Sequence, residues 1–440
     1  MYILTFSHLN YIDNACRKII SNINLDNPYH IVNIDVSSYY GAIFFPQENK
    51  HDINIVLPNL TAKKNIWQTP LTEKELQSVL NILWDTLENI YSKFLPKAAL
   101  IADDRGNFEK LFILFCNIKD IPVIHWVHGE EFTRLESWHT DDALPSNTKK
   151  NCIFNATKNI LPKGFNGRQY ICVNSSLDKI KLLYHGIMPQ QIVVTGNPTL
   201  DEFHNIAKHT FIHKQLYKIL YISTGFLKFN DLSSARAAYN FLFDCIYHLD
   251  KNKYKIDIRL KPGEDLNIIG CQYLKKIDDL SISIVDNKIP LENQMAAYDA
   301  ILVDKSSTCI KAVLMGIPTI VLKIPEIERK YQLCHFESMQ LAYIASPTMI
   351  NNILKCTLTQ SYINTQNEEL LLNEAMLMYK NDGNAYKRIA KYISSIINKK
   401  HITPVINNIL HYSVKKHTTK CSKIRAIIKK LLYFKKATII

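Results

Sequence analysis

The chain has 440 residues, of which 47% are apolar and 21% are charged, a composition typical of globular proteins rather than of fibrous or disordered ones. This length exceeds one ordinary hydrophobic core and predicts two domains. No apolar run is long enough to cross a bilayer, and the first residues lack the features of a signal peptide. The ten cysteines form no CxxC pair, so we expect buried free thiols and a reducing, cytoplasmic compartment.

The net charge of +13 is concentrated at the end of the chain. Residues 401–440 hold eight Lys, one Arg and no acidic residue, which gives +9 and leaves 13 − 9 = +4 for the rest. Basic pairs alternate there with Ile, Leu, Tyr and Phe, which predicts an amphipathic helix on an anionic membrane surface. A basic helix packed on the body and a tail without any partner are the alternatives. The nearly neutral body argues against a nucleic-acid-binding protein.

Apolar strands alternate with helices in the first half, which is typical of a doubly wound parallel sheet. We expect strands at residues 2–6, 30–37, 54–58, 98–104, 121–131, 169–176 and 191–198. We expect helices at residues 12–23, 71–95, 107–120 and 177–184.

The same pattern restarts after a junction near residues 203–217. We expect strands at residues 218–226, 255–262, 280–286, 300–304, 319–323 and 341–346, and weaker helical sequence at 347–398. The predicted fold class is therefore α/β, with two Rossmann-like, doubly wound domains. The predicted domains are residues 1–205 and 206–400, followed by the basic amphipathic tail 401–440. The ligand should lie in a central cleft, at the carboxyl ends of both sheets.

A strand, polar turn, helix and second strand follow one another in residues 297–323. Ser306, Ser307 and Thr308 supply hydroxyls at the point where the apolar strand gives way to a helix. Gly316 and Pro318 then end that helix. Because the hydroxyls stand at the carboxyl edge of a parallel sheet, this unit predicts an anion site for the phosphates of a nucleotide.

A second motif, Thr195-Gly196-Asn197-Pro198 with Asp201, ends the apolar strand before the junction. The glycine permits a tight turn, and the Asn-Pro pair favours an extended exit. An ordinary strand-to-loop turn at a domain junction is the alternative interpretation.

Several segments between residues 98 and 325 together resemble the GT-B superfamily. VVTGNPTLDEF (193–203) is similar to the TGNP…D signature at the interdomain crossing of UDP-N-acetylglucosamine 2-epimerases, lipid A disaccharide synthase and Kdo transferases. Residues 301–322 resemble their nucleotide-binding Ser-Ser…Gly-Pro segment. Residues 99–131, with a DDR turn and an HG strand end, resemble the N-terminal domain of polysaccharide glycosyltransferases. KIDIRLKPGEDL (255–266) resembles the His-Pro segment of bacterial sialyl-, Kdo- and glycerophosphate-transferring enzymes.

The chain departs from these patterns at two positions. Lys261 replaces the His that precedes Pro262, and a lysine neutralises a phosphate as a point charge without titrating near neutral pH. Lys311 stands where many UDP-sugar enzymes have an acidic residue that binds the ribose. The second departure favours a CMP- or CDP-linked donor, such as CMP-Kdo or CMP-sialate.

The resemblance implies a GT-B glycosyltransferase that moves a sugar from a nucleotide-activated donor to a lipid-linked glycan in lipopolysaccharide or capsule synthesis. The nucleotide-sugar is then a substrate, and no separate cofactor or metal is expected. The enzyme would be cytoplasmic and peripheral at the inner membrane of a bacterium, held there by residues 404–440, without a nucleic-acid partner. An epimerase of the UDP-N-acetylglucosamine 2-epimerase type is the alternative enzyme.

Glycosyl transfer needs a stabilised leaving phosphate and a carboxylate that acts as base or nucleophile. The candidates for this carboxylate are Asp103, Asp104 and Glu130, each of which could also be a solvated loop charge or, for Asp104, a helix cap. The predicted donor-binding residues are Lys261, Pro262, Glu264, Ser306, Ser307, Thr308, Asn197 and Gly196. The predicted contacts to acceptor or sugar are Arg105, His128, Gly129 and His8. His125 and His128 would share a face on a helix but not on the expected strand, so no metal site is predicted.

Overall fold

The computed structural model describes the chain in sixteen stretches, with gaps between them. These are residues 1–7, 10–23, 28–39, 52–61, 66, 70–103, 106–127, 169–184, 187–204, 210–229, 231–262, 264–304, 306, 308–330, 341–367 and 382–398. Seven predicted site residues lie outside them, as does the tail 401–440. These seven are His8, Asp104, Arg105, His128, Gly129, Glu130 and Ser307.

The first half is built on a seven-stranded parallel sheet with the order β3-β2-β1-β4-β5-β6-β7. Its strands are β1 (Tyr2–Ser7), β2 (His30–Asp35), β3 (Ile53–Val56), β4 (Ala98–Ile101), β5 (Val123–Trp126), β6 (Gln169–Val173) and β7 (Ile192–Val194). The chain fills one side of β1 and then continues with β4 on its other side. The strand order therefore reverses between β1 and β4, which is where such sheets bind ligands.

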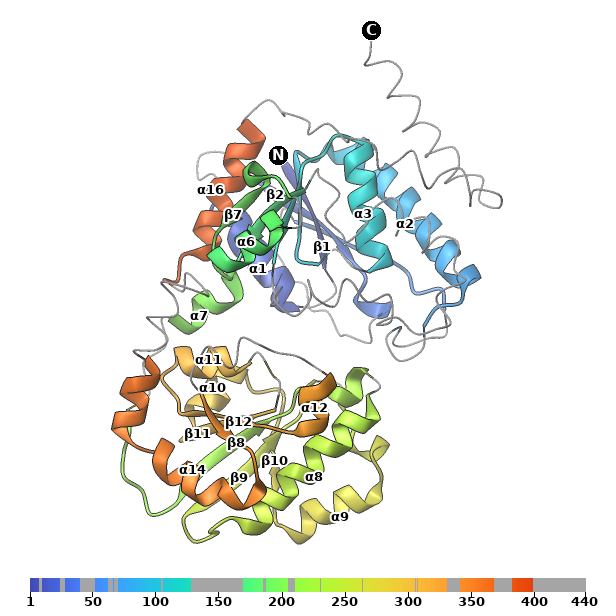
Figure 1. Cartoon of the computed structure of the whole chain (residues 1–440). Coiled ribbons are helices and arrows are strands. Elements are labelled where there is room, and N and C mark those ends of the chain that lie inside the picture. The colour runs from blue at the N-terminus through green and yellow to red at the C-terminus, as the bar shows by residue number, and fades with distance from the viewer. Residues whose placement is uncertain are drawn as a thin grey trace.

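The second half is built on a six-stranded parallel sheet with the order β10-β9-β8-β11-β12-β13. Its strands are β8 (Tyr217–Ile222), β9 (Tyr254–Arg259), β10 (Ser283–Ile284), β11 (Ala300–Val303), β12 (Thr319–Leu322) and β13 (Ala342–Ile344). Here the order reverses between β8 and β11. The two sheets repeat one architecture, and the two halves lie one above the other in Figure 1.

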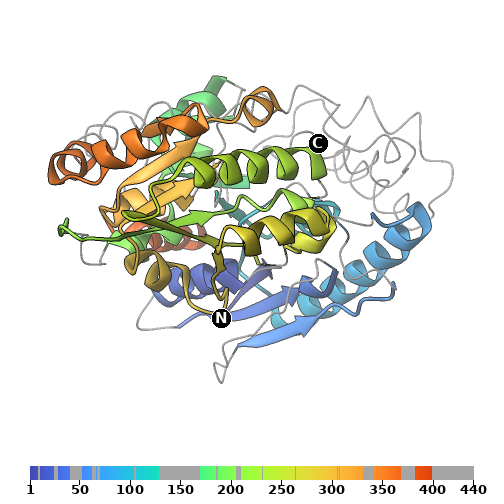
Figure 2. The same cartoon turned by 90° about the horizontal axis from the view of Figure 1, so that it is seen from below.

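Helices cover both faces of each sheet, because the central strands are apolar on both sides. On the first sheet, α2 (Glu73–Phe94) and α3 (Asn107–Ile118) pack on one face, and α1 (Asn10–Ser21) packs on the other. On the second sheet, α8 (Leu232–His248), α9 (Cys271–Asp279) and α14 (Ile350–Thr357) cover one face, and α10 (Leu291–Ala296) and α11 (Thr308–Leu314) cover the other. Figure 2 views the molecule from below, so the green-to-orange second half lies in front of the blue first half.

The last described helix, α16 (Ala385–Asn398), returns to the first sheet. Its buried residues Ile389, Ala390 and Ile393 share a core with Ile3 of β1 and Ile12 of α1. Figure 1 shows this red helix beside α1 in the upper half. Residues 385–398 fall within the expected second domain, 206–400, yet they pack on the first sheet. Two connections therefore join the halves, one at α7 (Asp201–His204), whose Phe203 packs in the core of the second sheet, and one before α16.

The α/β prediction of two doubly wound sheets is confirmed by this architecture. Every strand expected from the sequence is present, although most are shorter than expected. The expected strand 121–131, for example, corresponds to β5, which ends at Trp126. Within the described residues, no helix combines the length and the apolar character needed to span a membrane.

Candidate functional site

The carboxyl ends of β8 and β11 meet at the point where the second sheet reverses its strand order. Asp304 follows β11 directly and is fully buried. Its carboxylate accepts hydrogen bonds from the Tyr221 hydroxyl, at 2.9 Å, and from the Thr224 hydroxyl. This carboxylate was not among the predicted site residues, although it stands at the end of the same apolar strand as Ser306. It fixes the Thr224–Gly225 turn against the end of β11.

Lys261, a predicted donor-binding residue, lies at this reversal point. Its ammonium donates a hydrogen bond to the Thr224 carbonyl oxygen at 3.1 Å. Its aliphatic stem passes directly over Gly225, whose φ is +82°. A Cβ at Gly225 would lie 2.3 Å from Cδ and 2.8 Å from Cβ of Lys261. Only glycine therefore permits both this backbone conformation and this lysine position.

Glu264 closes the turn that carries Lys261. Its Oε2 accepts a hydrogen bond from the Lys261 backbone N–H at 3.1 Å, while Oε1 is buried. Burial raises the pKa of Glu264, and nearby Asp304 raises it further, against opposing contributions from Ser223 and Lys261. Burial also raises the pKa of Tyr239, which lies beside this carboxyl group. Pro262, between Lys261 and Glu264, is exposed.

The predicted hydroxyls follow β11 at the same edge of the sheet. The Ser306 hydroxyl donates to Thr308 Oγ1 at 3.0 Å and accepts from the Thr308 backbone N–H at 3.3 Å. Ser306 thus closes a turn at the first residue of α11, which has only seven residues. A helix this short offers a weak dipole, so any anion held here would depend on the hydroxyls and on Lys261.

The side chain of Lys311 contacts α7, the connection that follows the first sheet. Its ammonium lies 5.0 Å from the ring centroid of Phe203, a buried residue of α7. Burial lowers the pKa of Lys311, although Glu292 and Glu202 oppose this effect. A cation against an aromatic face is a favourable arrangement that also holds α11 against the crossing segment.

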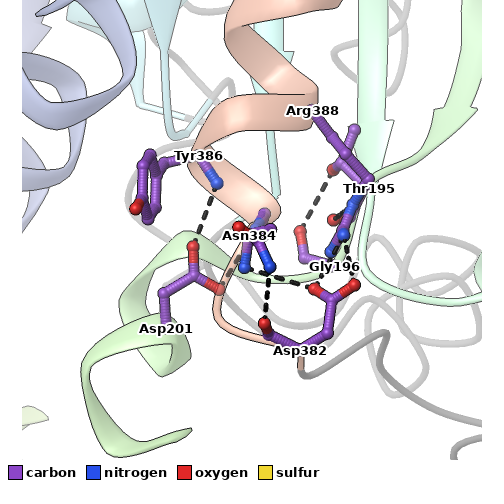
Figure 3. Close-up of polar contacts among 8 residues, drawn as sticks. Thr195, Gly196, Asp201, Asp382, Asn384, Tyr386 and Arg388 are labelled. Carbon is purple, nitrogen blue, oxygen red and sulfur yellow. Dashed lines mark hydrogen bonds and ion pairs between the residues drawn. The ribbon is translucent and has the colours of Figure 1, made fainter. Parts of the chain in front are cut away.

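Asp201, the acidic residue of the TGNP…D motif, caps the returning helix α16. Its two carboxylate oxygens accept hydrogen bonds from the backbone N–H groups of Ala385, at 3.2 Å, and of Tyr386, at 3.0 Å (Figure 3). Burial raises the pKa of Asp201, against the opposing effect of these N–H groups. Asp201 therefore links the connection at α7 to the start of α16.

Arg388 strengthens the same junction from α16. Its Nε donates to the Thr195 carbonyl oxygen at 2.7 Å, and its Nη1 pairs with both oxygens of Asp382 at 2.7 Å. Asn197 Oδ1 accepts from the Thr199 backbone N–H at 3.0 Å and so caps the short 3₁₀ helix η5 (Pro198–Leu200). Gly196 has a φ of +78°, as the predicted tight turn requires. The donor contacts expected of Gly196 and Asn197 stay predictions.

Asp103 is the one predicted catalytic carboxylate within the described residues. It follows β4 at the reversal point of the first sheet, where the chain leaves the sheet toward α3. A second carboxylate, Glu109, is buried in the first turn of α3. A Cβ at Gly106 would lie 1.9 Å from Glu109 Oε2. The burial of Glu109 was not predicted, because a charged residue in a helical run is usually exposed.

A metal site finds no support within the described stretches. There, no group of three or more His, Cys, Asp or Glu side chains could hold an ion. His125 is buried within β5, as the strand prediction implies. His128 and Glu130 lie outside the described residues.

The chain is similar to known proteins in its three-dimensional structure. No protein-family model matches the chain, and no curated protein matches its sequence. Among solved structures, UDP-GlcNAc 2-epimerase from Neisseria meningitidis, bound to UDP-GlcNAc, has a TM-score of 0.54 at 16% identity, covering 90% of this chain and 100% of that one. UGT89C1 from Arabidopsis thaliana has a TM-score of 0.57 at 12% identity, and the match covers 90% of this chain and 99% of UGT89C1. A glycosyltransferase from Rickettsia africae has a TM-score of 0.53 at 12% identity, and the match covers 91% of this chain and 99% of that enzyme.

The chain has the GT-B fold. At these identities the likeness establishes the fold alone, which glycosyltransferases and epimerases share.

Proposed function

We propose that the chain is a GT-B glycosyltransferase that binds a nucleotide-sugar at the reversal point of its second sheet. The observation that carries this proposal is the arrangement of Lys261 over Gly225, beside the ends of β8 and β11. A phosphate at this edge would meet the Lys261 ammonium and the hydroxyls of Ser306 and Thr308. Such groups stabilise the negative charge that develops on the departing nucleotide.

The catalytic carboxylate would come from the first sheet. Asp103 follows β4 where that sheet reverses its order, and Asp104 and Glu130 remain the other candidates. Such a carboxylate would remove the proton from the acceptor hydroxyl in an inverting route, or attack the donor in a retaining one.

A CMP-linked acidic sugar, such as Kdo or sialate, is the favoured donor. Lys311 replaces the carboxylate expected to bind the ribose of a UDP-sugar, and its ammonium packs on Phe203. This position therefore supplies no acidic group for a ribose.

The proposed acceptor is a lipid-linked glycan of lipopolysaccharide or capsule synthesis. The nine basic residues of 401–440 would hold the enzyme on the anionic inner membrane of a bacterium, from the cytoplasmic side. Deleting residues 404–440 should remove binding to anionic vesicles and leave nucleotide binding intact. Loss of both together would contradict this separation of functions.

Incubation of the full chain with CMP-Kdo, CMP-sialate or UDP-N-acetylglucosamine tests the reaction class. A transferase releases nucleotide at a rate that depends on added glycolipid acceptor and forms an elongated glycan. The second candidate is a sugar-nucleotide epimerase, favoured by the likeness to an epimerase solved with UDP-GlcNAc. Formation of an epimeric UDP-sugar without any acceptor would establish that alternative and overturn the transferase proposal.

A further inference from the structure

The turn from Lys261 to Glu264 is closed by two hydrogen bonds between the same two residues. The Glu264 backbone N–H donates to the Lys261 carbonyl oxygen at 2.9 Å, and Glu264 Oε2 accepts the Lys261 backbone N–H at 3.1 Å. With its backbone held in this way, Lys261 lays its stem over Gly225 and places its ammonium on the Thr224 carbonyl oxygen. The direction of the Lys261 side chain therefore depends on the Glu264 carboxyl group.

Several ionisable groups surround this carboxyl group, and they come from four elements. Tyr221 lies on β8, Tyr239 on α8, Lys261 follows β9, and Asp304 follows β11. Asp304 and Lys261 both act electrostatically on Glu264, and Glu264 acts on both tyrosines. If both carboxyl groups were ionised, this cluster would hold two negative charges against one positive charge. A bound phosphate would add further negative charge.

The two carboxyl groups differ in how well they tolerate ionisation. Asp304 accepts hydrogen bonds from the hydroxyls of Tyr221 and Thr224, and such bonds stabilise a carboxylate. Glu264 accepts the Lys261 N–H at Oε2, and the Ser223 side chain also stabilises its carboxylate, but its Oε1 is buried without a hydrogen-bond partner among the described residues. A buried oxygen that accepts no hydrogen bond favours the neutral form of a carboxyl group. An incoming phosphate should therefore drive a proton onto Glu264 rather than onto Asp304.

We infer that Glu264 is a positioning residue for Lys261 and that its carboxyl group takes up a proton when a nucleotide phosphate binds beside Lys261. This inference rests on the proposed function, because it requires the nucleotide to bind at this edge of the second sheet. The direction of the pKa of Glu264, which burial already raises, agrees with it. Linkage then requires that nucleotide affinity fall as pH rises through the titration of Glu264.

The test measures the dissociation constant by calorimetry from about pH 4.3, the ordinary pKa of a glutamate, upward to about pH 8. CMP methyl ester and UDP-N-acetylglucosamine serve as probes because neither carries a titrating phosphate. If binding raises the pKa of Glu264 by one unit, the affinity changes up to about tenfold across the titration. The wild-type chain should bind the probes more tightly at lower pH. It should also take up protons on binding, so the measured heat of binding should differ between buffers with different ionisation enthalpies.

Two variants show whether Glu264 itself is the group that takes up the proton. Glu264→Gln keeps an acceptor for the Lys261 N–H but cannot titrate, so the pH dependence and the proton uptake should both disappear. Asp265→Asn changes the neighbouring exposed carboxylate, which caps η7 (Leu266–Ile268) through Asn267, and should leave the pH dependence intact. Binding with equal pH dependence in the wild type and in Glu264→Gln would overturn the inference alone. No binding of either probe to the wild type would overturn the proposed function itself.

Discussion

Replacement of Asp201 by alanine tests the structural role assigned to the TGNP…D motif. Asp201 lies in α7 and accepts the first two N–H groups of α16, at 3.2 Å from Ala385 and 3.0 Å from Tyr386. These two residues are separated from Asp201 by almost the whole second half of the chain. The alanine variant would leave both N–H groups without this acceptor in a partly buried place.

The expected loss is about 2 kcal/mol in the free energy of unfolding. Loss of a helix cap costs about 1 kcal/mol and at most about 2 kcal/mol, and each lost hydrogen bond contributes about 1 kcal/mol. The burial that raises the pKa of Asp201 reduces the net value of its ionised form, so we do not expect a larger loss. In a domain of this size, about 2 kcal/mol lowers the thermal midpoint by about 4–8 °C.

Circular dichroism gives the midpoint, and hydrogen exchange of the first turn of α16 gives the local effect. Glu202→Ala is the matched control, because Glu202 is the next residue of α7 and pairs with Lys18 on the exposed surface. An exposed pair contributes about 0.5 kcal/mol, so the control should shift the midpoint by about 2 °C or less. Equal shifts in Asp201→Ala and Glu202→Ala, with unchanged exchange in α16, would refute the capping role.

The pH dependence of this contact has a defined sign. Because burial raises the folded-state pKa of Asp201, the added stability of its protonated form is complete below the unfolded pKa and is lost as pH rises through the folded pKa. Relative to Asp201→Asn, which cannot ionise, the wild-type chain should therefore lose stability as the pH rises from about 4. A difference that grows in the opposite direction would contradict the assigned shift.

Two further predictions concern the position of Lys261 and the exposure of the cysteines. Gly225→Ala should weaken nucleotide binding about tenfold or more, the equivalent of one contact to a charged group, because a Cβ would displace Lys261. Gly383→Ala, at another positive φ, is the control for backbone strain alone, and equal binding losses in both variants would contradict this account. A thiol reagent should modify the exposed Cys271 and Cys356 in the native chain, and the signal should fall in a Cys271→Ser, Cys356→Ser variant. Cys16, whose pKa burial raises to about 12, should react only on unfolding, and its modification in the native chain would contradict its burial.

Local sequence patterns were sufficient to predict the strands and the fold class. Strands such as β4 and β11 are apolar at every position, and all their residues are buried. Their apolar sequence therefore predicted these strands without further information. The ends of the strands were predicted less well, because the expected ranges included polar residues that follow the carboxyl ends of the strands and lie outside the sheet. Helix α8 was not predicted, although Asp231 accepts from the Ser234 N–H as a cap, and Ala235, Ala238 and Leu242 form a helical stripe.

Contacts between distant segments could not be predicted in the same way. The apolar stripe of α16 indicates that the helix is buried but not which sheet it covers. In the same way, Lys311 was interpreted through its sequence position, whereas its contact with Phe203 depends on how α7 and α11 meet. Lys261 was predicted from a motif, but the supporting roles of Gly225, Thr224 and Asp304 require the strand order.

Titration of the pure chain with CMP, CDP and UDP, followed by its thermal midpoint, tests whether the second half binds a nucleotide. A nucleotide at about 100 times its dissociation constant stabilises the folded chain by about 2.7 kcal/mol. We predict a higher midpoint with nucleotide, the largest rise with CMP, and a smaller rise in Gly225→Ala at the same concentration. A midpoint that none of the three nucleotides shifts would contradict a nucleotide-sugar site in the second half.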